Sequence, residues 1–224
     1  MDVAVRDRMA TQIAEWDSTG DGRVVFLECY LRMTRAVADR VDEGAFADGV
    51  WVDGLLDRFA DYYFASIDGG PDAAPVPEPW ILAHAAAVGN DAHPLQLLLA
   101  GVNAHINYDL VLTLIDVLDE EWADGDHDLR CVRRADYDLI NRIIADTADL
   151  VQDEVVETRA PWLDVLDRGL GRWDERAAVR LLGGWRSRVW RQATGLLDDA
   201  APLRTDRVRR IEAQCARRAR WLLA

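Results

Sequence analysis

The polar side chains best suited to chemistry interrupt one long apolar segment, residues 93–122. Between Leu97 and Leu118, apolar residues lie nearly all around the expected helix, which predicts a helix enclosed by other helices. Five strongly polar residues occur in it: Asn103, His105, Asn107, Asp109 and Asp116. A buried polar group without a hydrogen-bond partner costs about 1–3 kcal/mol. The cluster therefore indicates a site with a specific use.

His105 and Asp109 are one helical turn apart, so both lie on one face of the helix, and Asp116 follows on that face. Asp109 at this spacing would raise the pKa of His105 and fix its tautomer. We predict that His105 is a general acid or base and that Asp109 orients it. Asn103 and Asn107 lie on the opposite side, and one of them is predicted to donate a hydrogen bond to a developing oxyanion.

A divalent metal is an alternative at the same place, because His105 and Asp109 offer one nitrogen and one oxygen ligand. The metal would need at least one more ligand from another helix. The candidates for this ligand are Asp136, Asp138, Asn141 and His84. This alternative predicts a metal-assisted hydrolase.

Residues 17–28, DSTGDGRVVFLE, resemble a calcium-binding EF-hand loop. Asp17, Asp21 and Glu28 would be ligands, whereas Thr19 replaces a charged ligand and no second loop is present to pair with this one. An ordinary turn that caps the next helix explains the same residues. Calcium therefore remains an alternative for this segment.

Apolar residues recur at helical spacing along almost the whole chain, without a convincing run of alternating β-branched residues. Breaks at residues 17–22, 69–79 and 123–128, at Pro161 and around Pro202 separate eight or nine helices. We predict an all-α fold in one domain over residues 1–224, an orthogonal or bundle-like array around the buried central helix, with residues 69–79 as a hinge. Five of the nine tryptophans are candidates to line an apolar cavity: Trp51, Trp80, Trp162, Trp185 and Trp190.

The composition restricts the partners and the location. The 26 basic and 40 acidic side chains give a net charge of −14, which opposes phosphate binding, so nucleic acid is not an expected partner. Every basic residue is arginine, which excludes a lysine nucleophile or Schiff base. The chain begins without a continuous apolar stretch and has three cysteines without a CxxC pair, so we expect a cytoplasmic protein. The polar residues in the central helix argue against a membrane span.

Charge is unevenly distributed along the chain. Residues 159–224 carry 15 arginines and 8 acidic residues, and we expect these C-terminal helices to lie against the acidic remainder of the chain. The alternative is a basic amphipathic helix that binds a membrane or a partner protein.

The segment HPLQLLLAGVNAHINYDL resembles the signature of an uncharacterised, largely actinobacterial, all-helical family, a domain of unknown function marked by Asn-Ala-His-Ile-Asn-x-Asp-Leu. The resemblance extends to FLECYLRMTRAV, FADYYFAS, ADYDLIN and WRSRVWRQATGLL, and so covers most of the chain. The family's pattern falls on Asn103, His105, Asn107, Asp109, Asp136, Asn141, Arg186 and Trp190. The resemblance implies a helical fold and a site at these residues, and it implies no particular reaction.

We therefore expect an enzyme that performs cyclisation, isomerisation, elimination or hydration by acid–base chemistry on a small, largely apolar metabolite, without a covalent nucleophile. The predicted substrate-binding residues are Asp116, Asn141, Arg186 and Trp190. Three alternatives stay open: the metal-assisted hydrolase, the calcium-responsive module, and a non-catalytic ligand-binding or interaction protein whose polar cluster only fixes packing. Homo-oligomer formation is compatible with each of them.

Overall fold

A computed structural model describes residues 3–68, 75–89, 92–123, 125–159 and 175–224, with only the helical backbone described for 148–159 and 175–182. These residues form helices and no strands. The helices are α1 (Val3–Thr19), α2 (Val24–Asp42), α3 (Gly49–Ala65), α4 (Glu78–Gly89), α5 (Pro94–Ala104), η1 (His105–Asp109), α6 (Leu110–Ala123), α7 (His127–Arg159), α9 (Glu175–Leu197) and α10 (Ala201–Leu223). The all-α prediction is confirmed. Much of the predicted hinge at 69–79 lies outside the described residues, as does Pro161.

The helices α5, η1 and α6 join into one continuous helix over Pro94–Ala123, which we call the central helix. His93 precedes it as the N-cap, and its Nδ1 accepts a hydrogen bond from the backbone N–H of Leu95 at 3.3 Å. Gln96 closes the capping box, and Pro94 occupies the first turn, where its missing N–H costs nothing. The central helix therefore begins where the sequence predicts.

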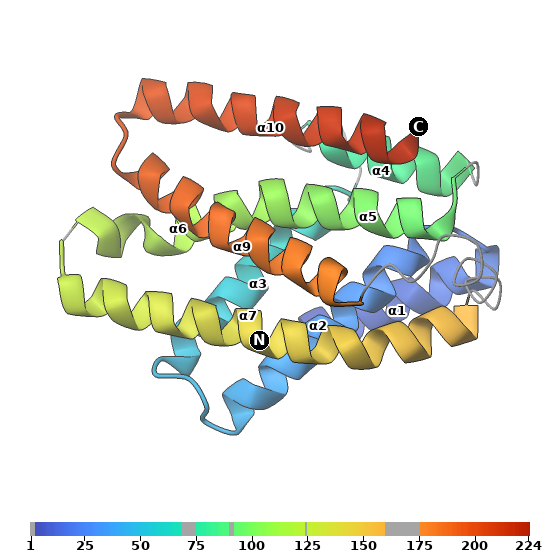
Figure 1. Ribbon diagram of the computed structural model, residues 1–224, viewed down its shortest axis with the longest axis horizontal. Helices are drawn as coiled ribbons and strands as arrows, with labels where there is room; N and C mark the ends of the chain where they lie inside the picture. Colours follow the sequence, from blue (N-terminus) through green and yellow to red (C-terminus); the bar gives the residue numbers. More distant parts are fainter. Residues whose placement is uncertain (1–2, 69–74, 90–91, 124, 160–174) are drawn as a thin grey trace.

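Helices surround the central helix on several sides, and its π-helical turn η1 contacts α3, α9 and α10 as well as its own neighbours α5 and α6. Figure 1 shows α10 and α7 on opposite sides of the molecule, with the central helix running between them. The central helix is long and apolar enough to cross a membrane by length and composition, but 67% of its most apolar window is buried inside the protein. That burial matches the predicted core helix.

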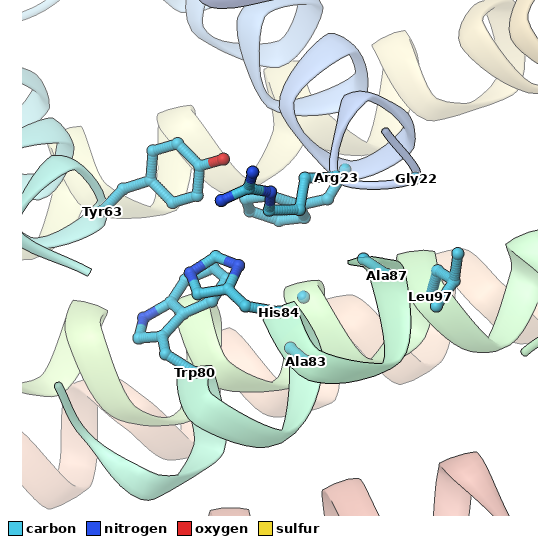
Figure 2. A pocket seen from close by; sticks show the side chains of 10 residues that line it. Gly22, Arg23, Tyr63, Trp80, Ala83, His84, Ala87 and Leu97 are labelled. Carbon is cyan, nitrogen blue, oxygen red and sulfur yellow. The ribbon is translucent and has the colours of Figure 1, made fainter. Parts of the chain in front are cut away.

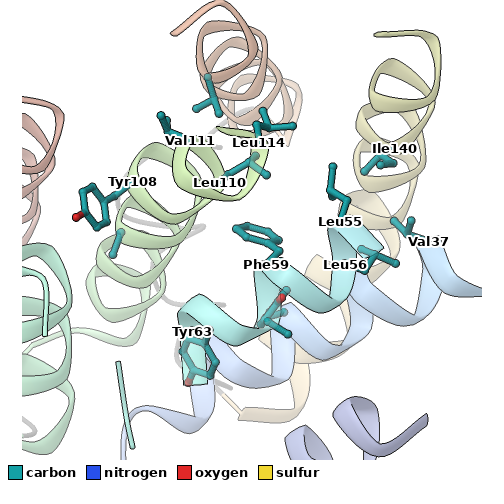
Figure 3. Packing of buried hydrophobic residues seen from close by; sticks show 14 of the residues in the cluster. Val37, Leu55, Leu56, Phe59, Tyr63, Tyr108, Leu110, Val111, Leu114 and Ile140 are labelled. Carbon is teal, nitrogen blue, oxygen red and sulfur yellow. The ribbon is translucent and has the colours of Figure 1, made fainter. Parts of the chain in front are cut away.

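Apolar side chains from α2, α3, α6 and α7 meet beside the central helix. Figure 3 shows Phe59 between α3 and α6, with Leu55 close to Ile140 of α7 and Leu56 close to Val37 of α2. Gly101 allows a further close approach, because a Cβ atom there would lie 2.7 Å from the ring of Phe26. This packing brings α2 directly against the site on η1.

Candidate active site

His105 and Asp109 form a buried pair on the π-helical turn η1. The exposed fractions of their side chains are 3% and 1%, and Nδ1 of His105 lies 3.1 Å from Oδ2 of Asp109. The indole N–H of Trp80, on α4, donates a hydrogen bond to the same Oδ2 at 2.9 Å. Because Trp80 uses Oδ2 as an acceptor, the arrangement favours the tautomer in which Nδ1 of His105 also donates to it. The predicted contact between His105 and Asp109 is therefore present.

Aromatic rings fix the orientation of the His105 imidazole. The ring of Phe59 stacks on it with a centroid distance of 3.6 Å and an interplanar angle of 10°. Tyr30 approaches its edge at a centroid distance of 4.2 Å, and Phe26 lies 5.5 Å away. An imidazole enclosed in this way has little rotational freedom, so Nδ1 and Nε2 keep distinct surroundings.

The Nε2 atom of His105 is buried and has no hydrogen-bond partner. His105 lies in the wall of a cavity of about 90 Å³, whereas Asp109 does not line it. Of the two ring nitrogens, Nε2 is therefore the one left without a partner, in a residue that lines the cavity. An imidazole with one nitrogen held by a carboxyl group and the other unpartnered has the arrangement of a general base and its orienting partner.

The cavity lies among α2, α3, η1, α7 and α9, and its wall is mainly apolar. The hydroxyls of Tyr30 and Thr34, both on α2, interact with each other in this wall, although not with the geometry of a regular hydrogen bond. Buried polar atoms normally have partners. The unpartnered Nε2 of His105 therefore indicates that the space is suited to a molecule with a polar group.

Arg186 of α9 is the charged residue in this wall, and it is only 3% exposed. Its Nε donates a short hydrogen bond to Oδ1 of Asn141 on α7. The hydroxyl of Tyr137 donates to the backbone carbonyl of Arg186 at 2.9 Å, and the guanidinium carbon lies 5.3 Å from the centroid of the Tyr137 ring. The structure thus brings two of the predicted substrate-binding residues together, Arg186 in the wall and Asn141 behind it.

The electrostatics of the pair differ from the expectation. Burial lowers the pKa of His105 well below its ordinary value, and the nearby Arg186 cation lowers it further. Burial raises the pKa of Asp109, against the hydrogen bond from Trp80. The prediction that Asp109 raises the pKa of His105 is therefore wrong, because desolvation outweighs the attraction to one neighbouring carboxyl group. The imidazole is neutral at pH 7, which is the form that accepts a proton.

Asn103 and Asn107 are buried but do not line the cavity. The Nδ2 of Asn103 donates to the backbone carbonyl of Cys215 at 3.0 Å, and its Oδ1 accepts from Arg218 at 2.9 Å. Cys215 in turn contacts the backbone carbonyl of Asn107 through its Sγ at 3.3 Å. Both asparagines therefore face α10, and the structure does not bring them to His105 as oxyanion donors.

Asp116 and Trp190 also lie away from the cavity. Oδ2 of Asp116 accepts hydrogen bonds from Arg58 and Tyr62 on α3, each at 2.7 Å, near the protein surface. The wider π-turn at η1 shifts the helical register, so Asp116 does not continue the face of His105 and Asp109. Trp190 packs on the ring of Tyr137 at a centroid distance of 4.9 Å.

The described residues do not supply a metal centre. No group of three or more His, Cys, Asp or Glu side chains among them has the geometry of a metal site. Both oxygens of Asp136 accept backbone N–H groups of Ala47 and Asp48, at 2.9 and 2.8 Å. Asp138 pairs with Arg134 at 2.8 Å, and His84 contacts Ser66. With only two ligands and a hydrogen bond from Trp80 on Oδ2, the residues at His105 do not fit a divalent metal.

The segment at 17–28 is a short turn. The helix α1 extends through Asp17 to Thr19, and α2 begins at Val24, so four residues separate them and no twelve-residue loop exists. Asp21 binds the backbone N–H and the guanidinium of the adjacent Arg23. Glu28 lies within α2. The EF-hand interpretation is wrong, and the ordinary turn accounts for these residues.

A small pocket of about 10 Å³ lies between this turn and α4, large enough for one water molecule. Figure 2 shows Arg23 and Tyr63 facing Trp80 and His84 across it. His84 stacks on Trp80 at a centroid distance of 5.0 Å, and its Nε2 lies 3.0 Å from the hydroxyl of Ser66. The side chains around this pocket pack against Trp80, which binds Asp109. The pocket itself is too small for a metabolite.

Residues that the sequence did not single out complete the site. The aromatic wall is formed by Phe26, Tyr30 and Phe59, whereas no described tryptophan lines the larger cavity. Trp162 lies outside the described residues. The sequence could have pointed to Thr34, since it is the polar residue on a mostly apolar face of α2. The role of Trp80 could not be predicted, because nothing in the sequence indicates that it contacts Asp109.

Comparison with models of known protein families gives a match over residues 3–224, to a family of unknown function. No curated protein and no solved structure matches the chain.

Proposed function

This chain belongs to DUF5995, a family of unknown function, and we propose that it is an enzyme that acts on a small, largely apolar metabolite by acid–base chemistry in the cavity beside His105. One observation carries the proposal: Nε2 of His105 is buried and unpartnered in a residue that lines an apolar cavity, while Nδ1 is held by Asp109. A buried ring nitrogen without a partner is costly as a structural feature alone.

The chemistry follows from the neutral imidazole. Nε2 accepts a proton from the substrate or, in hydration, from the water molecule that is added, and Asp109 stabilises the imidazolium through Nδ1–H. A proton then passes from Nε2 to another atom of the substrate or to a leaving group, and in ²H₂O exchange at Nε2 before this transfer replaces it with deuterium. This sequence serves isomerisation, elimination, hydration and cyclisation, and it needs no covalent nucleophile.

The proposal is tested by untargeted mass spectrometry of a bacterial metabolite extract incubated with the protein in ²H₂O. We expect one class of apolar compound to change in mass or structure with the wild-type protein. Proton abstraction and return would also introduce deuterium at carbon. The His105→Gln variant should slow the change by about 10²–10⁴-fold, which is the range for loss of a general acid or base.

His127→Gln is the control, because His127 is exposed at the start of α7 and does not line the cavity. Its melting temperature and that of His105→Gln establish that both variants are folded. If compounds bind to the wild-type protein but none is converted, the acid–base proposal is wrong and the ligand-binding alternative takes its place.

A further inference from the structure

We infer that the cavity binds an apolar molecule with a carboxylate group, which pairs with Arg186 while the apolar part lies against α2, α3 and α7. This inference rests on the proposed function, because it assigns a substrate class to the same cavity. It starts from the charge balance of Arg186.

Arg186 is a buried cation whose neighbours among the described residues are neutral. It is 3% exposed, its Nε donates to the amide oxygen of Asn141, and the Tyr137 ring lies beside it. Within the described part of the chain, no Asp or Glu lies within ion-pair distance of its guanidinium, and none lines the cavity. A cation in such surroundings is costly unless an anion accompanies it.

The position of Arg186 indicates where the anionic group of a ligand would bind. Arg186 and His105 both line the cavity, and the Arg186 charge lowers the pKa of His105. A guanidinium binds a carboxylate well because its N–H groups match the two oxygens. A ligand carboxylate at Arg186 would therefore lie in the same cavity as His105. The same negative charge would offset the effect of Arg186 on the imidazole.

The remaining wall determines the rest of the ligand. It consists largely of aliphatic side chains: Met33, Val37, Leu55, Leu56, Ile140 and Ile144. The volume of about 90 Å³ is smaller than the roughly 150 Å³ that holds benzene in an engineered cavity. The enclosed part of the ligand is therefore a short branched chain or a small ring.

The test compares isovalerate with isovaleramide, which has nearly the same shape without the charge, by isothermal titration calorimetry. We expect the wild-type protein to bind isovalerate at least 10-fold more tightly than the amide. Formate should bind at least 10-fold more weakly than isovalerate, because it lacks the apolar part. Arg186→Gln should bind isovalerate and the amide equally, and its melting temperature should not fall, because the variant removes a buried charge.

Arg188→Gln is the matched control, since Arg188 is exposed and lies on the same helix. It should keep the wild-type preference for isovalerate. If the amide binds the wild-type protein as tightly as isovalerate, the carboxylate inference fails while the apolar cavity of the proposed function stands. If formate binds as tightly as isovalerate, the site takes small anions only, which overturns the inferred class. If neither isovalerate nor the amide binds, both proposals fail.

Discussion

The behaviour of His105 depends on its burial more than on its neighbour in the sequence. The spacing to Asp109 correctly indicates a contact, and the two atoms are 3.1 Å apart. The spacing gives the wrong direction for the pKa, because it carries no information on the Phe59 ring, the Tyr30 ring or the Arg186 charge. Contacts within one helical turn can be predicted from sequence, whereas desolvation depends on residues far along the chain.

The protonation of His105 is directly measurable by NMR of the imidazole nitrogens, which is practical because the chain has four histidines. We expect the His105 ring to remain neutral at pH 6.5, where an ordinary histidine is half protonated, since burial and Arg186 lower its pKa. Arg186→Gln should move its pKa upwards. Titration of His105 at or above its ordinary value in the wild-type protein would mean that the Asp109 charge dominates, and would remove the neutral base from the proposed chemistry.

His84 predicts a pH dependence of stability. Burial lowers its pKa from 6.5 to about 4. Between these values the unfolded chain binds a proton that the folded protein does not, so the free energy of unfolding falls as pH falls. The His84 contribution over this range is of the order of 2 kcal/mol, allowing for its partial exposure. Urea unfolding at pH 7 and at pH 4 measures it, and the difference between the two pH values should be smaller by this amount in His84→Gln. An unchanged difference would contradict the lowered pKa.

At the scale of the elements, the sequence predicts the bounds and the burial of the central helix. It does not predict the π-helical turn η1 inside that helix. The capping box at His93 and Gln96 marks its beginning, and the apolar residues around it indicate burial. The π-turn at His105–Asp109 has no signature in composition or spacing. It changes the register of all later residues, so Asp116 faces Arg58 and Tyr62 instead of the site. A face assigned by regular helical geometry is reliable only as far as the helix stays regular.

Asn103 distinguishes a packing role from a catalytic role. Its amide connects the central helix to Cys215 and Arg218 on α10. Asn103→Ala should lower the free energy of unfolding by about 1–3 kcal/mol, because it leaves a buried carbonyl without its donor. Urea unfolding measures the loss. Isovalerate affinity should stay within twofold of wild type, because Asn103 does not line the cavity. Lost binding or turnover with unchanged stability would restore the oxyanion role expected from the sequence.

At the scale of the whole molecule, the C-terminal arginines lie against acidic parts of the chain, as the charge distribution predicts. Arg204 of α10 pairs with Asp119 of α6 at 2.8 Å, and Arg220 pairs with Glu78 at the start of α4. These exposed pairs orient α10 and each contributes little energy. The sequence does not predict which helices pack against each other. The charge distribution indicates that the C-terminal helices are attracted to the acidic part of the chain, but many arrangements of helices would bring the two together. Cytoplasmic location and the absence of nucleic-acid and membrane partners remain expectations from composition.

Arg133 holds three parts of the molecule together. It lies on α7 and donates to Glu121 at the end of α6, at 2.6 and 2.8 Å, and to Asp48 before α3 at 2.7 Å. Its side chain is 7% exposed. Arg133→Gln should lower the free energy of unfolding by about 1–2 kcal/mol, because two carboxylates that are about one-third exposed lose their cation. In Arg40→Gln, which breaks an exposed pair with Glu43, the loss should stay below about 1 kcal/mol. Equal losses in the two variants would show that burial of Arg133 adds nothing.

The stacking of Phe59 on His105 also provides a way to follow the site before a substrate is known. With the two rings nearly parallel and 3.6 Å apart, the carbon-bound protons of the imidazole lie within the ring current of the phenyl group. Their resonances are therefore displaced upfield from those of the other histidines. Any molecule that enters the cavity and separates the two rings moves these signals back downfield. The protein thus contains its own reporter for screening compounds at this site.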